Sequence, residues 1–130
     1  MEPSYLAMDT KSLQERIDLL LSRLGSCTIC PRQCGVNRLQ GETGFCKVGR
    51  RARVASYNLH FGEEAPLVGT NGSGTIFFSG CNLGCIFCQN YDISHSLEGS
   101  VAAQPEELAG IMLQLQKKGA HNINFVTPTH

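Results

Sequence analysis

Three cysteines with the spacing C-x3-C-x2-C follow directly after the apolar segment 75–78; they are Cys81, Cys85 and Cys88. Thiolates this close together on one loop can bind three irons of a cubane iron–sulfur cluster. The sequence offers no obvious fourth ligand, so one iron would keep an open coordination position. An open position separates catalytic metal sites from closed structural ones. The spacing therefore predicts a reactive [4Fe–4S] centre, and it is far more specific than a lone C-x2-C pair.

Four further cysteines lie upstream with the spacing C-x2-C-x3-C-x11-C; they are Cys27, Cys30, Cys34 and Cys46. Four thiolates suit either a closed tetrahedral zinc site or a second iron–sulfur cluster, and the spacing alone does not choose between them. Zinc would stabilise a loop-rich segment that cannot build its own core. A cluster could relay electrons toward the first centre. We slightly favour a structural metal, because nothing in these residues requires redox chemistry.

The length and charge of the chain exclude several classes of function. With 130 residues it is one modest domain or part of a larger one. Lys plus Arg equals Asp plus Glu at 11 each, which argues against a nucleic-acid partner. No apolar run approaches the ~20 residues needed to span a bilayer, and the N-terminus lacks the layout of a secretory signal. We therefore expect a cytoplasmic protein whose cysteines are metal ligands rather than disulfides.

The N-terminal half is predicted to form one helix and then loops. Residues 12–24 have an amphipathic pattern whose apolar face we expect to pack against the rest of the domain. Ser12 and Glu15 have the spacing of a capping box at its start. The glycine-rich segment 26–50 predicts loops around a metal, and residues 53–59 predict a strand. The expected organisation is a helix in 1–25, a four-cysteine metal segment in 26–52 and a third unit in 53–130.

The third unit has the pattern of an α/β fold. Residues 75–78 read as a strand buried on both faces, 105–118 as a helix and 123–126 as a second buried strand. Such a βαβ unit has parallel strands and a right-handed crossover, and chemistry gathers at the carboxyl ends of its strands. Two strands and one helix would leave edges and a face open. We therefore expect the sequence to be a fragment of a longer protein.

The cysteine loop, including the aromatic Phe87 just before its last cysteine, resembles the radical S-adenosylmethionine (AdoMet) superfamily. The segments 53–95 and 27–46 are similar to an uncharacterised branch related to the pyruvate formate-lyase activating enzyme. The resemblance implies the N-terminal part of a partial (β/α)6 barrel. It also implies an oxidoreductase in which the free iron binds AdoMet, and one electron cleaves AdoMet to a 5′-deoxyadenosyl radical.

The same resemblance implies roles and partners. Phe87 would pack near the adenine, and Asn90 stands where related enzymes often place an asparagine. Thr129 or His130 would replace a G-G-E-like motif as a polar contact to AdoMet. The amides of Ser79 and Gly80 are expected to donate to cluster sulfurs. An electron donor such as flavodoxin or ferredoxin is implied, together with a possible protein substrate.

Two observations limit these expectations, the first on the partner and the second on the class of function. The segment 69–74 lacks the Asp, Pro and Arg of the turn found in the activating enzymes, which argues against a glycyl-radical partner. The short chain also fits a non-catalytic electron-transfer or structural protein that carries one or two metal centres. Glu63 and Glu64 are read as a solvated turn rather than as a polar lining near the cluster. His60, His95 and His121 receive no role.

Overall fold

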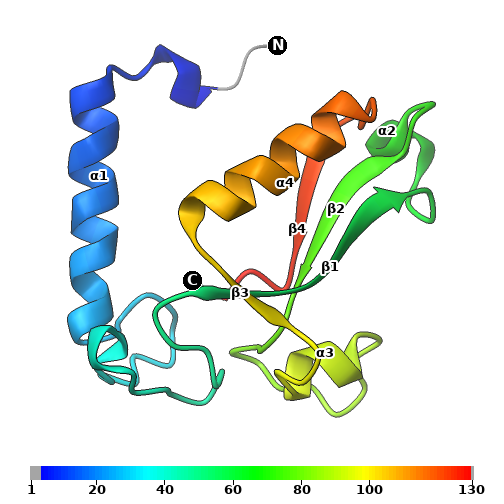
Figure 1. Cartoon of the computed structure of the whole chain (residues 1–130). Helices are drawn as coiled ribbons and strands as arrows, with labels where there is room; N and C mark the ends of the chain where they lie inside the picture. Colours follow the sequence, from blue (N-terminus) through cyan, green and yellow to red (C-terminus); the bar gives the residue numbers. More distant parts are fainter. Residues whose placement is uncertain (1–3, 130) are drawn as a thin grey trace.

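The computed structural model describes residues 4–129 as a mixed α/β chain built on one open four-stranded sheet (Figure 1). The strands are β1 Ala52–His60, β2 Ser73–Phe78, β3 Val101–Ala103 and β4 Ile123–Val126, in the spatial order β3-β1-β2-β4. Strand β1 pairs antiparallel with both β2 and β3, whereas β2 and β4 are parallel.

The parallel pair is joined by the helix α4 (Pro105–Lys117), which makes β2, α4 and β4 the predicted βαβ unit. Pro105 occupies the start of the helix, where its missing N–H costs nothing. The Glu107 carboxylate accepts a hydrogen bond from the Gln104 backbone N–H at 2.7 Å. These local signals are strong enough that the positions of all three elements were predicted to within two residues.

The helix α4 lies across one face of the sheet (Figure 1), and the hydrophobic core lies between the two. Leu115 of α4 and Ile76 of β2 are both 0% exposed. Val54, Phe78 and Ala103 complete the buried cluster, so β1, β2 and the edge strand β3 all contribute to it. This layer fixes the end of β2 from which the cysteine loop leaves.

The opposite face of the sheet has a different composition. Side chains alternate between the two faces of a strand, so the neighbours of Ile76 and Phe78 point away from α4. The register places the following residues together there: Ser56, Asn58, Thr75, Phe77, Asn124 and Val126. Most of them are polar. In the part of the chain that the structure describes, α4 is the helix that lies across the sheet, and it covers the other face.

The expectation of a sheet with only two strands is wrong. Strand β1, which was predicted, pairs with β2, and the three-residue strand β3 pairs with β1. The short helices α2 (Ala65–Val68) and α3 (Tyr91–His95) were not predicted either. Elements of three to five residues are too short to carry a period that could be recognised in the sequence.

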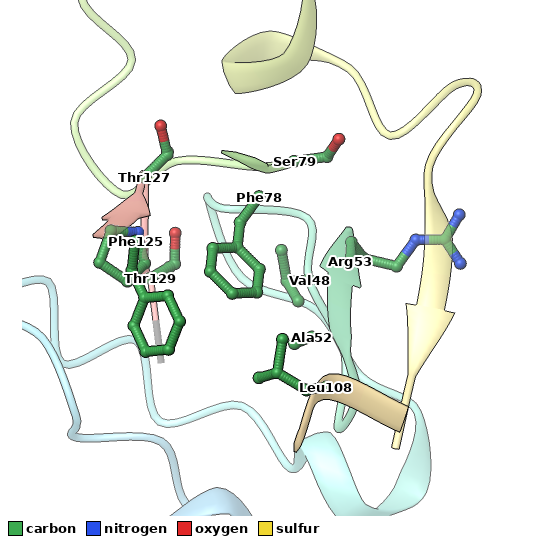
Figure 2. A pocket seen from close by; sticks show the side chains of 10 residues that line it. Val48, Ala52, Arg53, Phe78, Ser79, Leu108, Phe125, Thr127 and Thr129 are labelled. Atoms are coloured by element: carbon green, nitrogen blue, oxygen red, sulfur yellow. The ribbon is translucent and has the colours of Figure 1, made fainter. Parts of the chain in front are cut away.

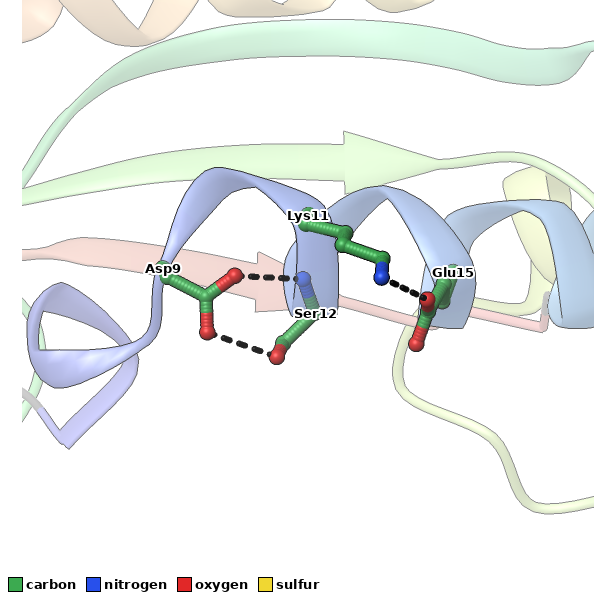
Figure 3. A network of polar contacts seen from close by, with 4 residues as sticks. All are labelled: Asp9, Lys11, Ser12 and Glu15. Carbon is green, nitrogen blue, oxygen red and sulfur yellow. Dashed lines mark hydrogen bonds and ion pairs between the residues drawn. The ribbon is translucent and has the colours of Figure 1, made fainter.

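The helix α1 (Thr10–Ser22) begins two residues before the predicted start, because Asp9 caps it. The Asp9 carboxylate accepts hydrogen bonds from the Ser12 backbone N–H at 2.9 Å and from the Ser12 hydroxyl at 2.7 Å (Figure 3). Glu15 forms a 3.9 Å ion pair with Lys11 instead. The predicted capping box is therefore wrong, since Ser12 donates hydrogen bonds to the capping residue Asp9 and is not itself the cap.

The predicted packing of this helix is also wrong. Within the described residues α1 has no buried side chain, and it stands apart from the sheet (Figure 1). The 3-10 turn Arg23–Gly25 that follows buries Leu24, which contacts the loop segment rather than the sheet. Two further 3-10 turns lie at Ser4–Ala7 and Arg38–Gln40. No helix among residues 4–129 has the length and apolar character needed to cross a membrane.

Replacing Leu115 by Ala should lower the free energy of unfolding by about 2–5 kcal/mol, because it opens a cavity in the layer between α4 and the sheet. Leu113 lies on the same helix but is 64% exposed, so Leu113→Ala should change the free energy by less than about 0.5 kcal/mol. Urea unfolding followed by circular dichroism measures both. Equal effects of the two substitutions would contradict the assigned core.

Candidate metal centre

The C-x3-C-x2-C loop begins where β2 ends. The Ser79 backbone N–H donates to the Arg53 carbonyl at 2.7 Å, and the Gly80 N–H donates to the Ile93 carbonyl at 2.8 Å. Both amides are thus used to hold the exit from the strand. The prediction that they donate to cluster sulfurs is wrong in this structure. The amide that does reach a sulfur is that of Leu83, which lies 3.3 Å from Cys81 Sγ.

The three cysteines of the loop share a partly exposed position at this edge. A turn in which the Cys88 N–H donates to the Cys85 carbonyl at 3.3 Å brings these two residues together. The Ser94 hydroxyl on α3 donates to Cys88 Sγ at 3.5 Å. The Leu83 N–H and the Ser94 hydroxyl thus both point at sulfur atoms of the loop, as donors around a sulfur-ligated group would. The loop therefore suits thiolate ligation.

No three His, Cys, Asp or Glu side chains among the described residues converge on one point that could hold a single metal ion. Each cysteine that binds a cubane cluster ligates a different iron, so its ligands do not need to meet at one point. The partly exposed thiols and their N–H and O–H donors fit a cluster of this kind.

The four-cysteine segment is held together by its backbone and by one arginine. The Cys27 N–H donates to the Val36 carbonyl, and the Gly35 N–H donates back to the Cys27 carbonyl, both at 3.0 Å. Cys27 and Cys46 are buried, Cys30 is half-buried and Cys34 is exposed. Sequence analysis gave no role to the arginine, Arg38, which is 2% exposed in the middle of this segment.

Arg38 lies among the thiols. Its Nη2 donates to Cys46 Sγ at 3.3 Å and contacts Cys34 Sγ at 3.7 Å. Burial alone would raise the pKa of the Cys27 thiol, but the hydrogen bond and charge of Arg38, together with the Ile29 amide, hold that pKa below its ordinary value. Burial opposes the charge of Arg38 as well, yet the thiols raise its pKa. The guanidinium of Arg38 therefore favours the thiolate form of Cys27.

The two cysteine segments are in contact. Arg32 donates through Nε to the Asn82 carbonyl and through Nη2 to the Leu83 carbonyl at 3.2 Å. The same guanidinium lies 3.5 Å from the centre of the Phe45 ring, as expected for a cation–π contact. Lys47 donates to the His95 carbonyl at 2.8 Å. The four-cysteine segment thus packs on the loop that carries Cys81.

The contact is tightest at Gly80, where φ is +83°. A Cβ atom at this position would lie 2.5 Å from the Cys46 carbonyl oxygen and 2.5 Å from Val48 Cγ2. The backbone before Cys81 therefore touches the backbone after Cys46 with no room for a side chain. Only glycine adopts this left-handed backbone without strain.

Of the residues predicted to contact AdoMet, Phe87, Asn90 and Thr129 lie in three different places, and His130 lies outside the described residues. Thr129 lines a cavity of about 240 Å³ between α4 and the sheet, shown in Figure 2, and its hydroxyl donates to the Gly80 carbonyl at 3.2 Å. Asn90 lines a second cavity of about 410 Å³ on the opposite face. Phe87 is 88% exposed on the loop. The structure does not bring these side chains together.

The second cavity contains two residues that sequence analysis set aside, His60 and Glu63. His60 Nε2 lies 3.6 Å from Glu63 Oε1 near the end of β1, and both side chains line the cavity together with Phe77, Gln89, Asn90 and Val126. The reading of Glu63 as part of a solvated turn is therefore incomplete. No local signal could have found it, because the cavity depends on the antiparallel pairing of β1 with β2.

Gly80→Ala should lower the free energy of unfolding by about 2 kcal/mol or more, because it forces a side chain into a strained backbone and an occupied space. The matched control is Gly110→Ala on α4, where an added Cβ meets nothing within 4 Å and stability should rise by about 0.5–1 kcal/mol. Thermal unfolding of both variants measures the difference. A Gly80→Ala protein as stable as the parent would show that the two segments do not pack this closely.

Comparison with known proteins gives two curated relatives, both from Methanocaldococcus jannaschii. The chain is 34% identical over 120 residues to the uncharacterized protein MJ0674, and the aligned region covers 88% of this chain and 34% of that protein. It is 27% identical over 119 residues to the uncharacterized protein MJ0808, covering 79% of this chain and 35% of that protein. No family model and no solved structure matches. The chain therefore spans about a third of the length of the curated relatives that it matches.

Proposed function

We propose that this chain is the cluster-binding part of an iron–sulfur, AdoMet-dependent radical enzyme of the activating-enzyme type. The observation that carries the proposal is the position of the C-x3-C-x2-C loop. It leaves the carboxyl end of β2, the first strand of a parallel βαβ unit. Reactive groups in α/β folds gather at this end of the strands.

The two faces of the sheet support a barrel-like arrangement. In a (β/α) barrel the helices cover the outer face, and the inner face carries the residues that line the site. Here α4 covers the apolar face, while the other face carries polar side chains such as Ser56, Asn58 and Asn124. The relatives are about three times as long as this chain, which is room enough for further βα units. A partial (β/α)6 barrel is the architecture that we propose for the whole protein.

Cys81, Cys85 and Cys88 would bind three irons of the cluster and leave the fourth iron without a protein ligand. Such a cluster would supply a free iron for binding AdoMet and one electron for its reductive cleavage to methionine and a 5′-deoxyadenosyl radical. The Leu83 N–H and the Ser94 hydroxyl would stabilise the thiolates to which they donate. A one-electron donor of the flavodoxin or ferredoxin class would reduce the cluster, and a protein substrate is possible.

We assign AdoMet to the cavity of about 410 Å³ that Asn90 lines. Ligand sites usually have volumes of roughly 300–1,000 Å³ and combine apolar walls with a few polar groups. This cavity offers Phe77 and Val126 as apolar walls, with Glu63 and Asn90 as polar groups. The other cavity, of about 240 Å³, is smaller and is lined mainly by apolar side chains. A cationic sulfonium and an ammonium group favour the cavity that contains a carboxylate.

A non-catalytic electron-transfer protein is the second candidate. The observation in its favour is the direct contact between the two cysteine segments through Arg32, Phe45 and Lys47. Two metal centres held this close could pass electrons without binding AdoMet. The experiment below separates the two candidates.

Electron paramagnetic resonance of anaerobically reconstituted, dithionite-reduced protein tests the proposed function. A [4Fe–4S]+ signal should change on adding AdoMet, and the products should include methionine and 5′-deoxyadenosine. Replacing Cys81, Cys85 and Cys88 by Ser should abolish both effects. A cluster signal that is indifferent to AdoMet in the full-length protein would favour the electron-transfer candidate.

Glu63→Gln should weaken the binding of AdoMet by about tenfold, because a charge-assisted contact is worth roughly 1.5 kcal/mol. The adjacent Glu64→Gln is the matched control, since Glu64 does not line the cavity. Equilibrium dialysis with labelled AdoMet measures both dissociation constants. If the two variants bind alike, AdoMet occupies another place.

A further inference from the structure

Arg38 has an unusual set of partners for a buried cation. Its side chain is 2% exposed, and a buried charge must be paired or hydrogen bonded to remain ionised. Among the described residues, neither of the ion pairs with a carboxylate involves it. Nη1 donates to the Val48 carbonyl, and the remaining partners are sulfur atoms. The guanidinium is therefore balanced by thiols of this segment and not by Asp or Glu.

One donor of the guanidinium is left over. Arg38 Nε is buried and has no hydrogen-bond partner among the described residues. A buried donor without a hydrogen-bond acceptor costs about 1–3 kcal/mol, so we expect an acceptor beside Arg38 Nε. Nε and Nη2 point from the same edge of the planar guanidinium, and Nη2 contacts Cys34 and Cys46. The unused N–H is thus directed toward the sulfur-rich side of the arginine.

The two metals considered for this segment differ in what they offer to that N–H. A zinc ion draws four sulfurs to about 2.3 Å from one point and brings no acceptor of its own. An iron–sulfur cluster is larger and carries sulfides that accept N–H bonds. The described thiols do not converge on one point, and Arg38 Nη2 lies against two of them, Cys34 and Cys46. The arrangement suits the larger, sulfide-bearing group.

We infer that Cys27, Cys30, Cys34 and Cys46 bind an iron–sulfur cluster, and that Arg38 is its positioning residue, donating to the cluster sulfurs through Nε and Nη2. This cluster is separate from the one proposed at Cys81, and the inference holds whether or not the protein cleaves AdoMet. Reduction by one electron adds a negative charge to the cluster. A buried guanidinium beside it stabilises the reduced form and raises the reduction potential.

The nature of the metal is tested in a protein whose Cys81, Cys85 and Cys88 are all replaced by Ser. After anaerobic reconstitution with iron, sulfide and zinc offered together, this variant should bind iron and acid-labile sulfide in equal amounts. A further Cys46→Ser substitution should remove both. Zinc bound without sulfide, or no bound metal at all, would overturn the inference. Because the loop cysteines are absent, the result does not depend on the proposed function.

The role of Arg38 is tested in the same triple variant by redox titration and by pulsed electron paramagnetic resonance. Growth with ¹⁵N-arginine should give a nitrogen hyperfine coupling in the reduced cluster. Arg38→Gln should remove that coupling and make the midpoint potential more negative, whereas Arg38→Lys, which keeps the charge, should restore much of the potential. The matched control is Arg50→Gln, an exposed arginine of the same segment, which should change neither quantity.

Every outcome of this second test bears on the inference. If Arg38→Gln does not retain a cluster, the coupling in the parent variant and the potential of Arg38→Lys remain measurable. A parent cluster without arginine coupling would show that Arg38 does not donate to it. An unchanged potential in both Arg38 variants would overturn the role assigned to its charge.

Discussion

The close approach of two backbones at Gly80 is the contact on which the arrangement of the two cysteine segments depends. The chain turns out of β2 with φ +83° at this residue, directly against the backbone of Cys46–Val48. No larger residue could occupy this place without moving one segment away from the other. Two further contacts join the segments: Lys47 donates to the His95 carbonyl, and Arg32, which stacks on Phe45 of its own segment, donates to the Leu83 carbonyl. The two sets of thiols lie close together because residue 80 is a glycine and has no side chain.

The sheet supports this contact from the other side. Burial of Ile76 and Leu115 fixes β2 against α4, so the end of β2 cannot shift relative to the core. Hydrogen bonds from Ser79 to Arg53 and from Gly80 to Ile93 then direct the chain into the loop. The Thr129 hydroxyl adds a bond from beyond β4 to the Gly80 carbonyl. Four elements that are distant in sequence therefore determine where Cys81 lies.

Much of this fold could be predicted from local patterns, and the rest could not for identifiable reasons. The segments 75–78, 105–118 and 123–126 carry buried runs or a helical period with caps, and their predicted positions are confirmed to within two residues. Strand β3 has only three residues and therefore no period to detect. The start of α1 was misplaced because Asp9 and Ser12 are both good capping residues, and only the geometry shows which one accepts. Its apolar stripe predicted a packing partner that the described residues do not provide.

The candidate site also contains residues that could be predicted from the sequence and residues that could not. The spacing of Cys81, Cys85 and Cys88 is visible in sequence because the ligands belong to one loop. Arg38 is not visible, because no local pattern marks an arginine that a folded loop buries among its own cysteines. Glu63 is considered but read as solvated, because its cavity forms only where separate segments meet. The amides of Ser79 and Gly80 were misassigned for a related reason, since the strand exit already uses them.

The two edge strands of the sheet, β3 and β4, differ from each other. On one side β3 is only three residues long, and a border this short offers few free N–H and C=O groups for another strand. On the other side β4 is paired only with β2 within residues 4–129, and it already runs parallel to its neighbour. A strand added parallel to β4 would extend the parallel half of the sheet. It would also lengthen the edge, formed by the carboxyl ends of β2 and β4, at which Cys81 lies. The architecture is thus directional, with growth of the sheet favoured at β4 and ended at β3.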